Sequence, residues 1–199
     1  MNDGLAGTST QAVRPNSRLL KPVGEKTMNL NRRAREAQLR AISIFTQRPE
    51  RAQVVNRGSA EVRAGLCCTY EQAGHRLTLD MPGTIGGSDE GPSPGYFGRA
   101  AICGCLAIGI KMTAVRENLH LDTVRIGIEQ DWDNRGVLAM EGASPVPNDT
   151  RIAIEIRSSE PEEKVGEMVS RALANDPWFL AYRDAQPVST TISITKEIA

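Results

Sequence analysis

The chain has 199 residues, of which 40% are apolar, and it carries 24 basic and 24 acidic residues. This length suits one domain with an appendage. The balanced charge creates no whole-chain field that would favour nucleic acid or a membrane as a partner, and we expect neither. No uninterrupted run of about 18 apolar residues is present, so we expect no transmembrane helix.

The N-terminal region reads as an appendage to the main domain. Its first stretch, MNDGLAGTSTQAVRPNSRLL, lacks an apolar core of signal-peptide length. We therefore expect a cytoplasmic protein whose four cysteines are thiols rather than disulfides. Residues 1–24 are rich in Gly, Ser, Thr and Pro and are expected to be flexible. Residues 25–56 form a helical extension, with an amphipathic helix from about Met28 to Gln47 that would dock on the body or on a partner chain.

The central part of the chain predicts a hairpin, a loop and a long helix. Residues 59–81 alternate like two strands around a turn at Ala73-Gly74. A loop dense in Gly and Pro follows, and Ser93-Pro94 then opens a helix that should reach about Asn118, with Ser93 as its N-cap. The first half of this helix is apolar nearly all round, which predicts burial on all sides.

The remaining elements predict an α+β fold. Strands are expected in TVRIGIEQDW, in a short return strand VLAM and in TRIAIEIRS. A capping box of Ser159 and Glu162 would start the next helix. A short helical turn in NDPWFLAYRDA and a closing strand, PVSTTISIT, complete the chain. Hairpins grouped around two helices indicate antiparallel pairing rather than a doubly wound sheet, within one domain over residues 57–199.

Several kinds of site find no support in the sequence. The two histidines, His75 and His120, have no Cys-x-x-Cys pair to complete a zinc site. No G-x-S-x-G elbow is present, and neither a Walker nor a Rossmann fingerprint occurs. We therefore expect no metal and no cofactor, and the cysteines remain as the groups that can carry chemistry.

Two of the four cysteines lie two residues apart in GRAAICGCLAIGI. On a helix, Cys103 and Cys105 point about 200° apart, so they cannot easily bond to each other. Ala101, Cys105 and Gly109 form a stripe of small residues that would let another helix approach closely at Cys105. Cys105 is therefore either a reactive thiol or a packing residue, and Cys103 is expected to pack on the opposite side.

The sequence GHRLTLDMPGTIGGSDEGPSP, followed by a helix carrying AAICGCLAIGIKM, resembles the OsmC/Ohr family. The resemblance covers residues 57–196, and the N-terminal helix is similar to an extension found in only some members. It implies an OsmC/Ohr-like fold, an intertwined homodimer in which antiparallel sheets from both chains wrap two long central helices. It also implies reduction of organic hydroperoxides, in which a cysteine on the central helix becomes a sulfenic acid.

Transferred residue by residue, the resemblance makes Cys105 the peroxidatic cysteine. Family members use a helper Glu ten residues earlier, where this chain has Gly95, and a resolving cysteine in a later helix, where it has Asp176. The activating arginine belongs to the first strands or their loops, where Arg63 and Arg57 are the candidates. A dithiol partner would restore the oxidised cysteine.

The departures from the family pattern leave alternatives open. Cys103 is a possible alternative resolving thiol, as are Cys67 and Cys68, whose adjacency disfavours a disulfide between them. Asp176 is either a carboxylate near Cys105 or simply a cap before Pro177. The chain is thus a hydroperoxide reductase with an atypical site or, alternatively, a non-catalytic protein that holds a small apolar ligand at the dimer interface. Three aromatic residues would line that cleft or pack in the core: Trp178, Phe179 and Tyr182.

Overall fold

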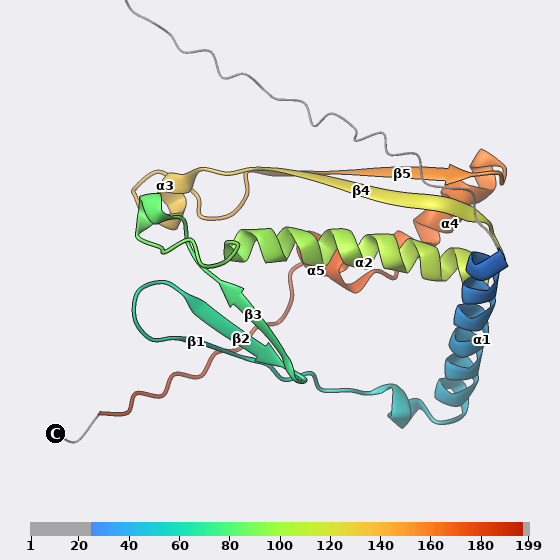
Figure 1. Cartoon of the computed structure of the whole chain (residues 1–199), viewed down its shortest axis with the longest axis horizontal. Coiled ribbons are helices and arrows are strands. Elements are labelled where there is room, and N and C mark those ends of the chain that lie inside the picture. The colour runs from blue at the N-terminus through green and yellow to red at the C-terminus, as the bar shows by residue number, and fades with distance from the viewer. Residues whose placement is uncertain (1–24, 197–199) are drawn as a thin grey trace, which may run out of the picture.

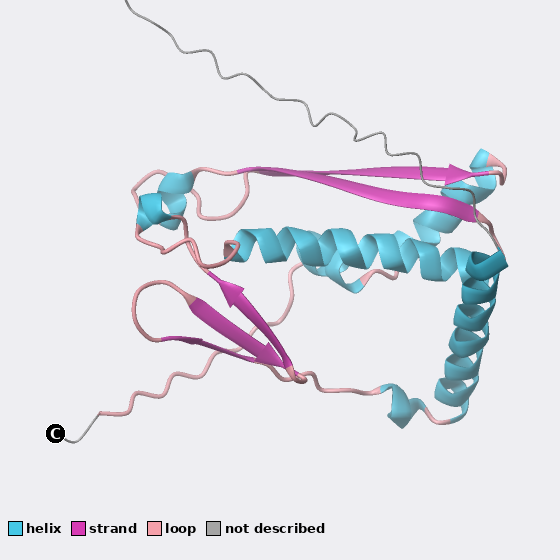
Figure 2. Cartoon of the chain, in the orientation of Figure 1, coloured by secondary structure: helices cyan, strands magenta, loops and turns pink. Residues whose placement is uncertain are grey.

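A single long helix organises the molecule. The computed structural model describes residues 25–196, and in it α2 (Pro94–Arg116) runs between two separate antiparallel sheets (Figure 1). One sheet pairs β4 (Leu121–Asp131) with β5 (Asp149–Ser158), and the other has the order β1 (Ser59–Val62), β2 (Cys68–Gln72), β3 (His75–Leu79). Figure 2 shows the same arrangement coloured by element type, with the long helix α2 between the two groups of strands. The expected α+β architecture is confirmed.

The core lies where α2 packs against the β4–β5 sheet and α4 (Glu162–Leu173). Alternation along both strands places apolar residues on one face, so that Val124 pairs with Ile156 and Ile126 with Ile154. Burying each large apolar side chain contributes about 1.5–3 kcal/mol, which makes this cluster the main source of stability. Its buried members are Ile110, Ala114, Leu119, Leu121, Met168 and Ala172.

The opposite face of α2 is only partly covered by the residues that the structure describes. Only six of its 23 residues are buried, all of them on the sides facing other elements. Ala101, Cys105, Ile108 and Met112, spaced i, i+4, i+7 and i+11, form an apolar stripe along the other side. In this stripe Ile108 is 62% exposed and Met112 42% exposed. A single chain therefore provides only part of the all-round burial that the sequence predicts for this helix.

By length and composition alone, α2 is apolar enough to cross a membrane. Core helices of folded domains meet the same criterion, and here Ile102, Leu106 and Ile110 are packed against other elements of the chain. Arg99 and Lys111 interrupt its apolar sequence, and the Lys111 ammonium donates a hydrogen bond to the Leu121 carbonyl at 2.6 Å.

A buried aspartate fixes the loop that leads into α2. Asp80 is 1% exposed, and its carboxylate accepts hydrogen bonds from the backbone N–H groups of Met81, Ser88 and Glu90. Glycine is required in the same loop, because a Cβ at Gly87 would lie 1.6 Å from the Met81 carbonyl oxygen. The D-x-P and G-G segments of the sequence are thus parts of one hydrogen-bonded structure.

Several predicted elements are confirmed with small changes. The N-terminal helix α1 runs from Glu25 to Gln47, and α5 (Pro177–Arg183) is the short helix expected after α4. The turn at Ala73-Gly74 is confirmed by the pairing of Gln72 with His75. The hairpin gains the third strand β1 in front of it, and short 3-10 helices occur at Pro49–Ala52 (η1) and Gly83–Ile85 (η2).

Ser93 is confirmed as the N-cap of α2, although its hydroxyl does not bond to the helix. Three other local predictions were wrong. VLAM is not a return strand, because α3 (Asn134–Val137) occupies this connection and Asp133 caps it by accepting the Arg135 N–H. The Ser159–Glu162 capping box does not form, since α4 begins at Glu162 after Pro161 and no side chain caps it. The closing strand over 187–195 has no partner strand among the described residues, which leaves Val188, Ile192 and Ile194 more than 80% exposed.

The Asp80 site generates a prediction about acid stability. Burial raises the pKa of Asp80, but three backbone donors more than offset this and lower the pKa below its ordinary value. The resulting stabilisation is present above the ordinary carboxyl pKa and is lost as the pH falls through the lower folded value. We expect Asp80→Asn to lower the melting temperature by several degrees at pH 7 and much less at pH 2, measured by circular dichroism.

Asp89→Asn, at an exposed position in the same loop, is the matched control and should change the melting temperature less. A difference between wild type and Asp80→Asn that stayed constant from pH 7 to pH 2 would show that the charge of Asp80 does not stabilise the loop.

Candidate functional site

Cys105 lies in the middle of the apolar stripe of α2, where the start of α5 covers this side of the helix in part. It is partly buried, one turn after Ala101 and just before Ile108 on the same side of the helix. Cys103 is also partly buried but points to a different side of α2. Of these two thiols, Cys105 is the one presented on the uncovered face.

Helix α5 places a carboxylate next to this thiol. Asp176 is the N-cap of α5, where one carboxylate oxygen, Oδ1, accepts the Phe179 N–H at 2.8 Å. The residue is only 3% exposed, and Oδ2 has no hydrogen-bond partner of normal geometry in the described part of the chain. A Cβ at Gly109 would lie 3.0 Å from Oδ2, so glycine lets the carboxylate approach α2 closely. Asp176 therefore both caps a helix and faces the central helix near Cys105.

The surroundings of Cys105 favour its protonated form. Burial raises the pKa of the thiol, and the neighbouring Asp176 carboxylate raises it further by interacting with the thiol proton and repelling a thiolate. The backbone N–H of Trp178 points to the sulfur and lowers the pKa, but the overall direction is upward. At neutral pH Cys105 is consequently a thiol.

The other three cysteines are also free, partly buried thiols. Burial raises the pKa of Cys103. The pKa of Cys67 is raised by burial and by Glu90, whose carboxylate accepts a hydrogen bond from the Cys67 thiol at 3.6 Å. Cys68 lies in β2 opposite Leu79. Their role as alternative resolving thiols stays a prediction.

The structure places the two candidate arginines on the surface near the first sheet. Arg63 forms an ion pair with Glu61 at 2.9 Å, and its side chain is 83% exposed. Arg57 lines a surface cavity together with His75. Within one chain neither guanidinium contributes to the pKa of Cys105, so an activating role for either stays a prediction. Gly95 occupies the position of the family's helper Glu. A Cβ on Gly95 would lie 3.2 Å from the Arg99 guanidinium.

The three candidate aromatic residues belong to α5, beside the N-terminal half of α2. Trp178 is 52% exposed and Tyr182 43% exposed, while Phe179 is half-buried under the Arg183 guanidinium at 5.7 Å. A Cβ on Gly98 of α2 would lie 3.0 Å from the Tyr182 hydroxyl. Trp178 and Tyr182 are therefore surface residues of the single chain rather than core residues.

Two contributions to the site were missed in the sequence. The Trp178 N–H that points to the Cys105 sulfur belongs to the first turn of α5, and the Asp-Pro start of that helix was the signal that could have indicated it. Gly109 was placed in a stripe for helix packing, whereas its lack of a side chain makes room for Asp176. Among the described residues, no group of three or more His, Cys, Asp or Glu side chains is arranged to hold a metal ion.

Comparisons with known proteins agree with this architecture. The structure is similar to that of an OsmC-like protein from Mycoplasma pneumoniae, with a TM-score of 0.54 and 13% identity over 66% of this chain and 89% of the other. A hypothetical protein from Aquifex aeolicus matches with a TM-score of 0.50 and 11% identity over 65% and 87% of the two chains. An organic hydroperoxide resistance protein OsmC from Legionella pneumophila gives a TM-score of 0.48 and 16% identity over 65% and 90%.

A search of the curated proteins found no match to the chain. The sequence model of the OsmC-like protein family, however, matches residues 87–190, which contain α2, Cys105 and Asp176. This segment is more than half of the chain, and the structures from Mycoplasma pneumoniae and Aquifex aeolicus have a similar fold. The chain thus belongs to the OsmC-like protein family.

Proposed function

We propose that this protein reduces organic hydroperoxides through Cys105, with Asp176 assisting the transfer of the thiol proton. The observation that carries the proposal is the pairing of a partly exposed thiol with a buried carboxylate that has an unpartnered oxygen. A hydroperoxide that donates its O–H to Oδ2 of Asp176 is held with its terminal oxygen near the sulfur. Membership of the OsmC-like family supports the same chemistry.

In the oxidation step, the sulfur of Cys105 attacks the terminal peroxide oxygen. An S–O bond forms and the O–O bond breaks, which oxidises the thiol to a sulfenic acid and reduces the hydroperoxide to an alcohol. The thiol proton passes to Asp176 and then to the departing alkoxide, so no charge accumulates. Asp176 thereby takes part in the chemistry although it cannot replace a resolving cysteine.

The return step uses an external thiol compound. One thiol of a dithiol condenses with the sulfenic acid, releases water and forms a mixed disulfide with Cys105. The second thiol then attacks that disulfide, which regenerates Cys105 and leaves the reductant oxidised as its own disulfide. A cytoplasmic location, which the sequence predicts, would keep such a dithiol reduced.

We also propose that the functional unit is a homodimer. The uncovered stripe of α2 contains only apolar or small residues, and a second copy of the same stripe would remove it from water. Since Cys105 lies in this stripe, the second chain would also complete the walls of the substrate site.

A non-catalytic binding function is the second candidate, and the raised pKa of Cys105 favours it. A thiol that keeps its proton behaves as a small apolar residue. Together with Trp178 and Tyr182, it would bind a small apolar ligand at the dimer interface. The two candidates differ in whether Cys105 reacts faster with a hydroperoxide than an ordinary thiol does.

Replacing Asp176 by Asn tests the electrostatic part of the site. Asn also caps helices well, so the fold should be retained, while the negative charge beside the thiol is lost. We expect the pKa of Cys105 to fall and its alkylation by iodoacetamide at pH 7 to become several-fold faster, measured for the Cys105 peptide by mass spectrometry. Asp184→Asn, at the other end of α5, is the matched control.

The same variant separates proton transfer from simple repulsion. If Asp176 transfers the proton, Asp176→Asn should react faster than wild type with iodoacetamide. The same variant should not reduce cumene hydroperoxide faster than wild type does. Equal acceleration of both reactions would instead show that Asp176 merely opposes ionisation and takes no part in the chemistry.

The pH dependence of oxidation is a second test. Because the pKa of Cys105 is raised, the thiolate is a minor species at neutral pH, and its fraction grows about tenfold per pH unit below that pKa. If the neutral thiol attacks with the help of Asp176, the rate of sulfenate formation should rise less steeply between pH 6 and 8 than the rate of alkylation by iodoacetamide. The rate of sulfenate formation is measured in quenched reactions that contain a sulfenate trap. In Cys105→Ser, the trap should label no residue of α2. Oxidation of wild type no faster than that of a free thiol would favour the binding function.

The proposed dimer is tested at the centre of the uncovered stripe. Ile108→Asp would place a charge in the interface without touching the buried side of α2, so we expect the dimer dissociation constant to rise at least about tenfold. Ile108→Leu conserves volume and should leave it nearly unchanged. Sedimentation equilibrium measures both, and an unaltered constant for Ile108→Asp would place the interface elsewhere.

A further inference from the structure

Helix α1 packs on its own chain through polar groups. The Arg35 side chain donates a hydrogen bond to the Arg116 carbonyl at 3.4 Å, and the Arg116 guanidinium donates one to the Gln38 side chain at 2.8 Å. The apolar stripe of α1 remains uncovered, with Leu30 52% exposed and both Ile44 and Phe45 44% exposed. None of the described elements of the same chain covers this stripe, so a partner chain is the occupant that we consider.

The segment after α1 continues this uncovered surface. Val54 and Val55 are 76% and 72% exposed. We call residues 27–57 the arm. It carries seven arginines and only two glutamates, so it is strongly basic in a chain whose total charge is zero.

A complementary surface lies at the far end of the β4–β5 ribbon. We call residues 129–151 the tip, and it carries five acidic residues against two arginines. Its apolar side chains are exposed as well, with Leu138 61% exposed and Met140 52% exposed. The other exposed apolar residues of the tip are Trp132, Val137 and Val146.

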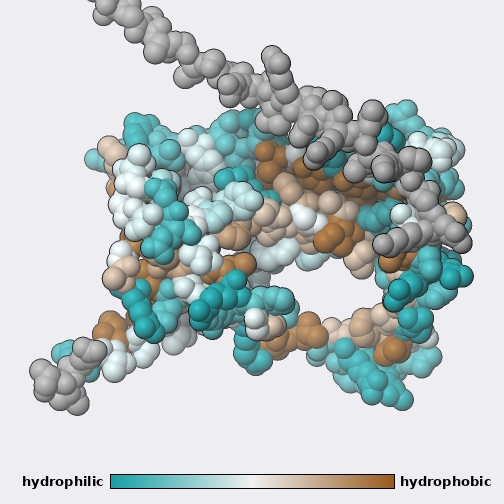
Figure 3. Space-filling view, viewed as in Figure 1, coloured by the Kyte–Doolittle hydropathy of each residue, from teal (hydrophilic) through white to brown (hydrophobic). Residues whose placement is uncertain are grey.

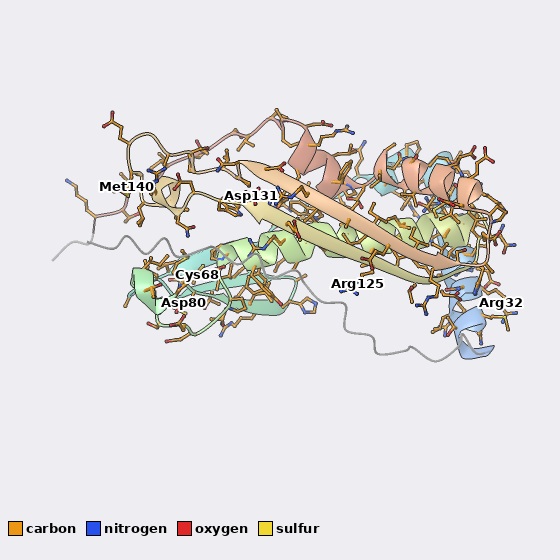
Figure 4. All side chains as sticks on the ribbon, turned by 90° about the horizontal axis from the view of Figure 1, so that it is seen from above. Arg32, Cys68, Asp80, Arg125, Asp131 and Met140 are labelled. Carbon is orange, nitrogen blue, oxygen red and sulfur yellow. The ribbon has the colours of Figure 1, made fainter. Side chains whose placement is uncertain are left out.

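The arm and the tip cannot meet within one chain. Figure 4 shows Arg32 of the arm at one end of the molecule, and Asp131 and Met140 of the tip toward the other end. The 23-residue helix α2 between them is about 34 Å long. A two-fold axis perpendicular to α2 would set two copies antiparallel, so that each arm reaches the tip of the other chain. Such an isologous contact forms twice, and opposite charges face each other both times.

We propose that the arm is a clasp that binds the tip of a second copy of this chain. The inference rests on the proposed homodimer and is independent of the thiol chemistry. It accounts for the exposed apolar side chains of the arm and the tip, for their opposite charges and for their positions at opposite ends of the molecule. The basic amphipathic helix is therefore part of a protein interface.

The shape of the molecule favours a folded partner over a membrane surface. Figure 3 shows the molecule hollowed between α2, the arm and the first sheet, with apolar residues at the margin. A lipid bilayer is flat and cannot enter such an opening, whereas a compact domain can fill it.

Charge insertion into the clasp tests the proposal. Ile44→Asp/Phe45→Asp in the full chain should raise the dimer dissociation constant at least tenfold, as measured by sedimentation equilibrium. Leu138→Asp/Met140→Asp should do the same. The variant that combines all four substitutions should dimerise only slightly more weakly than either double variant, because both pairs of substitutions break the same contact. Ser43→Asp/Thr46→Asp is the matched control, since it adds the same charge at exposed positions on the other side of α1 and should change the constant less than twofold.

The outcomes separate this proposal from the homodimer itself. If Ile108→Asp dissociates the dimer but the arm and tip variants do not, the clasp is wrong and the dimer stands. Fully additive effects of the arm and tip pairs would show that they contact different surfaces and would also overturn the clasp. A wild-type chain that is monomeric at all concentrations overturns both.

A membrane as the alternative occupant gives a distinct result. Phosphatidylglycerol vesicles would then co-sediment with wild type and not with Ile44→Asp/Phe45→Asp, while the dimer constant stays the same in both. This result would overturn the clasp, whereas loss of dimer affinity without vesicle binding supports it. Circular dichroism of each variant checks that α1 is retained.

Discussion

The burial of α2 is the constraint on which the rest of the structure depends. This helix is apolar on nearly every side, yet the β4–β5 sheet and α4 cover only the side that carries Ile110 and Ala114. The Asp80 loop, the first sheet and α5 are all arranged around it, and the candidate thiol belongs to its incompletely covered side. A helix of this kind is stable in water only when its remaining surface is also buried. The candidate site and the proposed interface therefore both follow from one requirement.

The chemistry of the site is set by a conflict between a thiol and a carboxylate. A reactive cysteine normally needs a positive neighbour that stabilises the thiolate, whereas Cys105 has the buried Asp176 beside it. The Trp178 N–H is the one described group that favours the thiolate. Such a pair keeps the cysteine protonated at neutral pH. In the proposed function, a substrate with an O–H group would engage the free carboxylate oxygen before the sulfur reacts.

Sequence patterns were sufficient where local physics determines the structure. The extent of α2, the turn at Ala73-Gly74 and the alternating strands of the second sheet follow from periodicity and turn chemistry. The same patterns failed for VLAM, where a one-turn helix capped by Asp133 replaces a strand, because four residues contain too little periodicity to separate the two. The closing strand failed for a different reason, since alternation predicts a strand only if a neighbouring strand is present to pair with it. The contact of Asp176 with α2 depends on the packing of α5, which no local pattern encodes.

The most direct test of this account is the molar mass of the unmodified protein in solution, measured by light scattering during size-exclusion chromatography at micromolar concentration. Burial of the uncovered side of α2 by a second copy predicts a particle of twice the 21.6 kDa chain mass. A single species of chain mass that stays soluble across the concentration range would contradict the account, because the apolar stripe around Cys105 would then be stable in water without a partner.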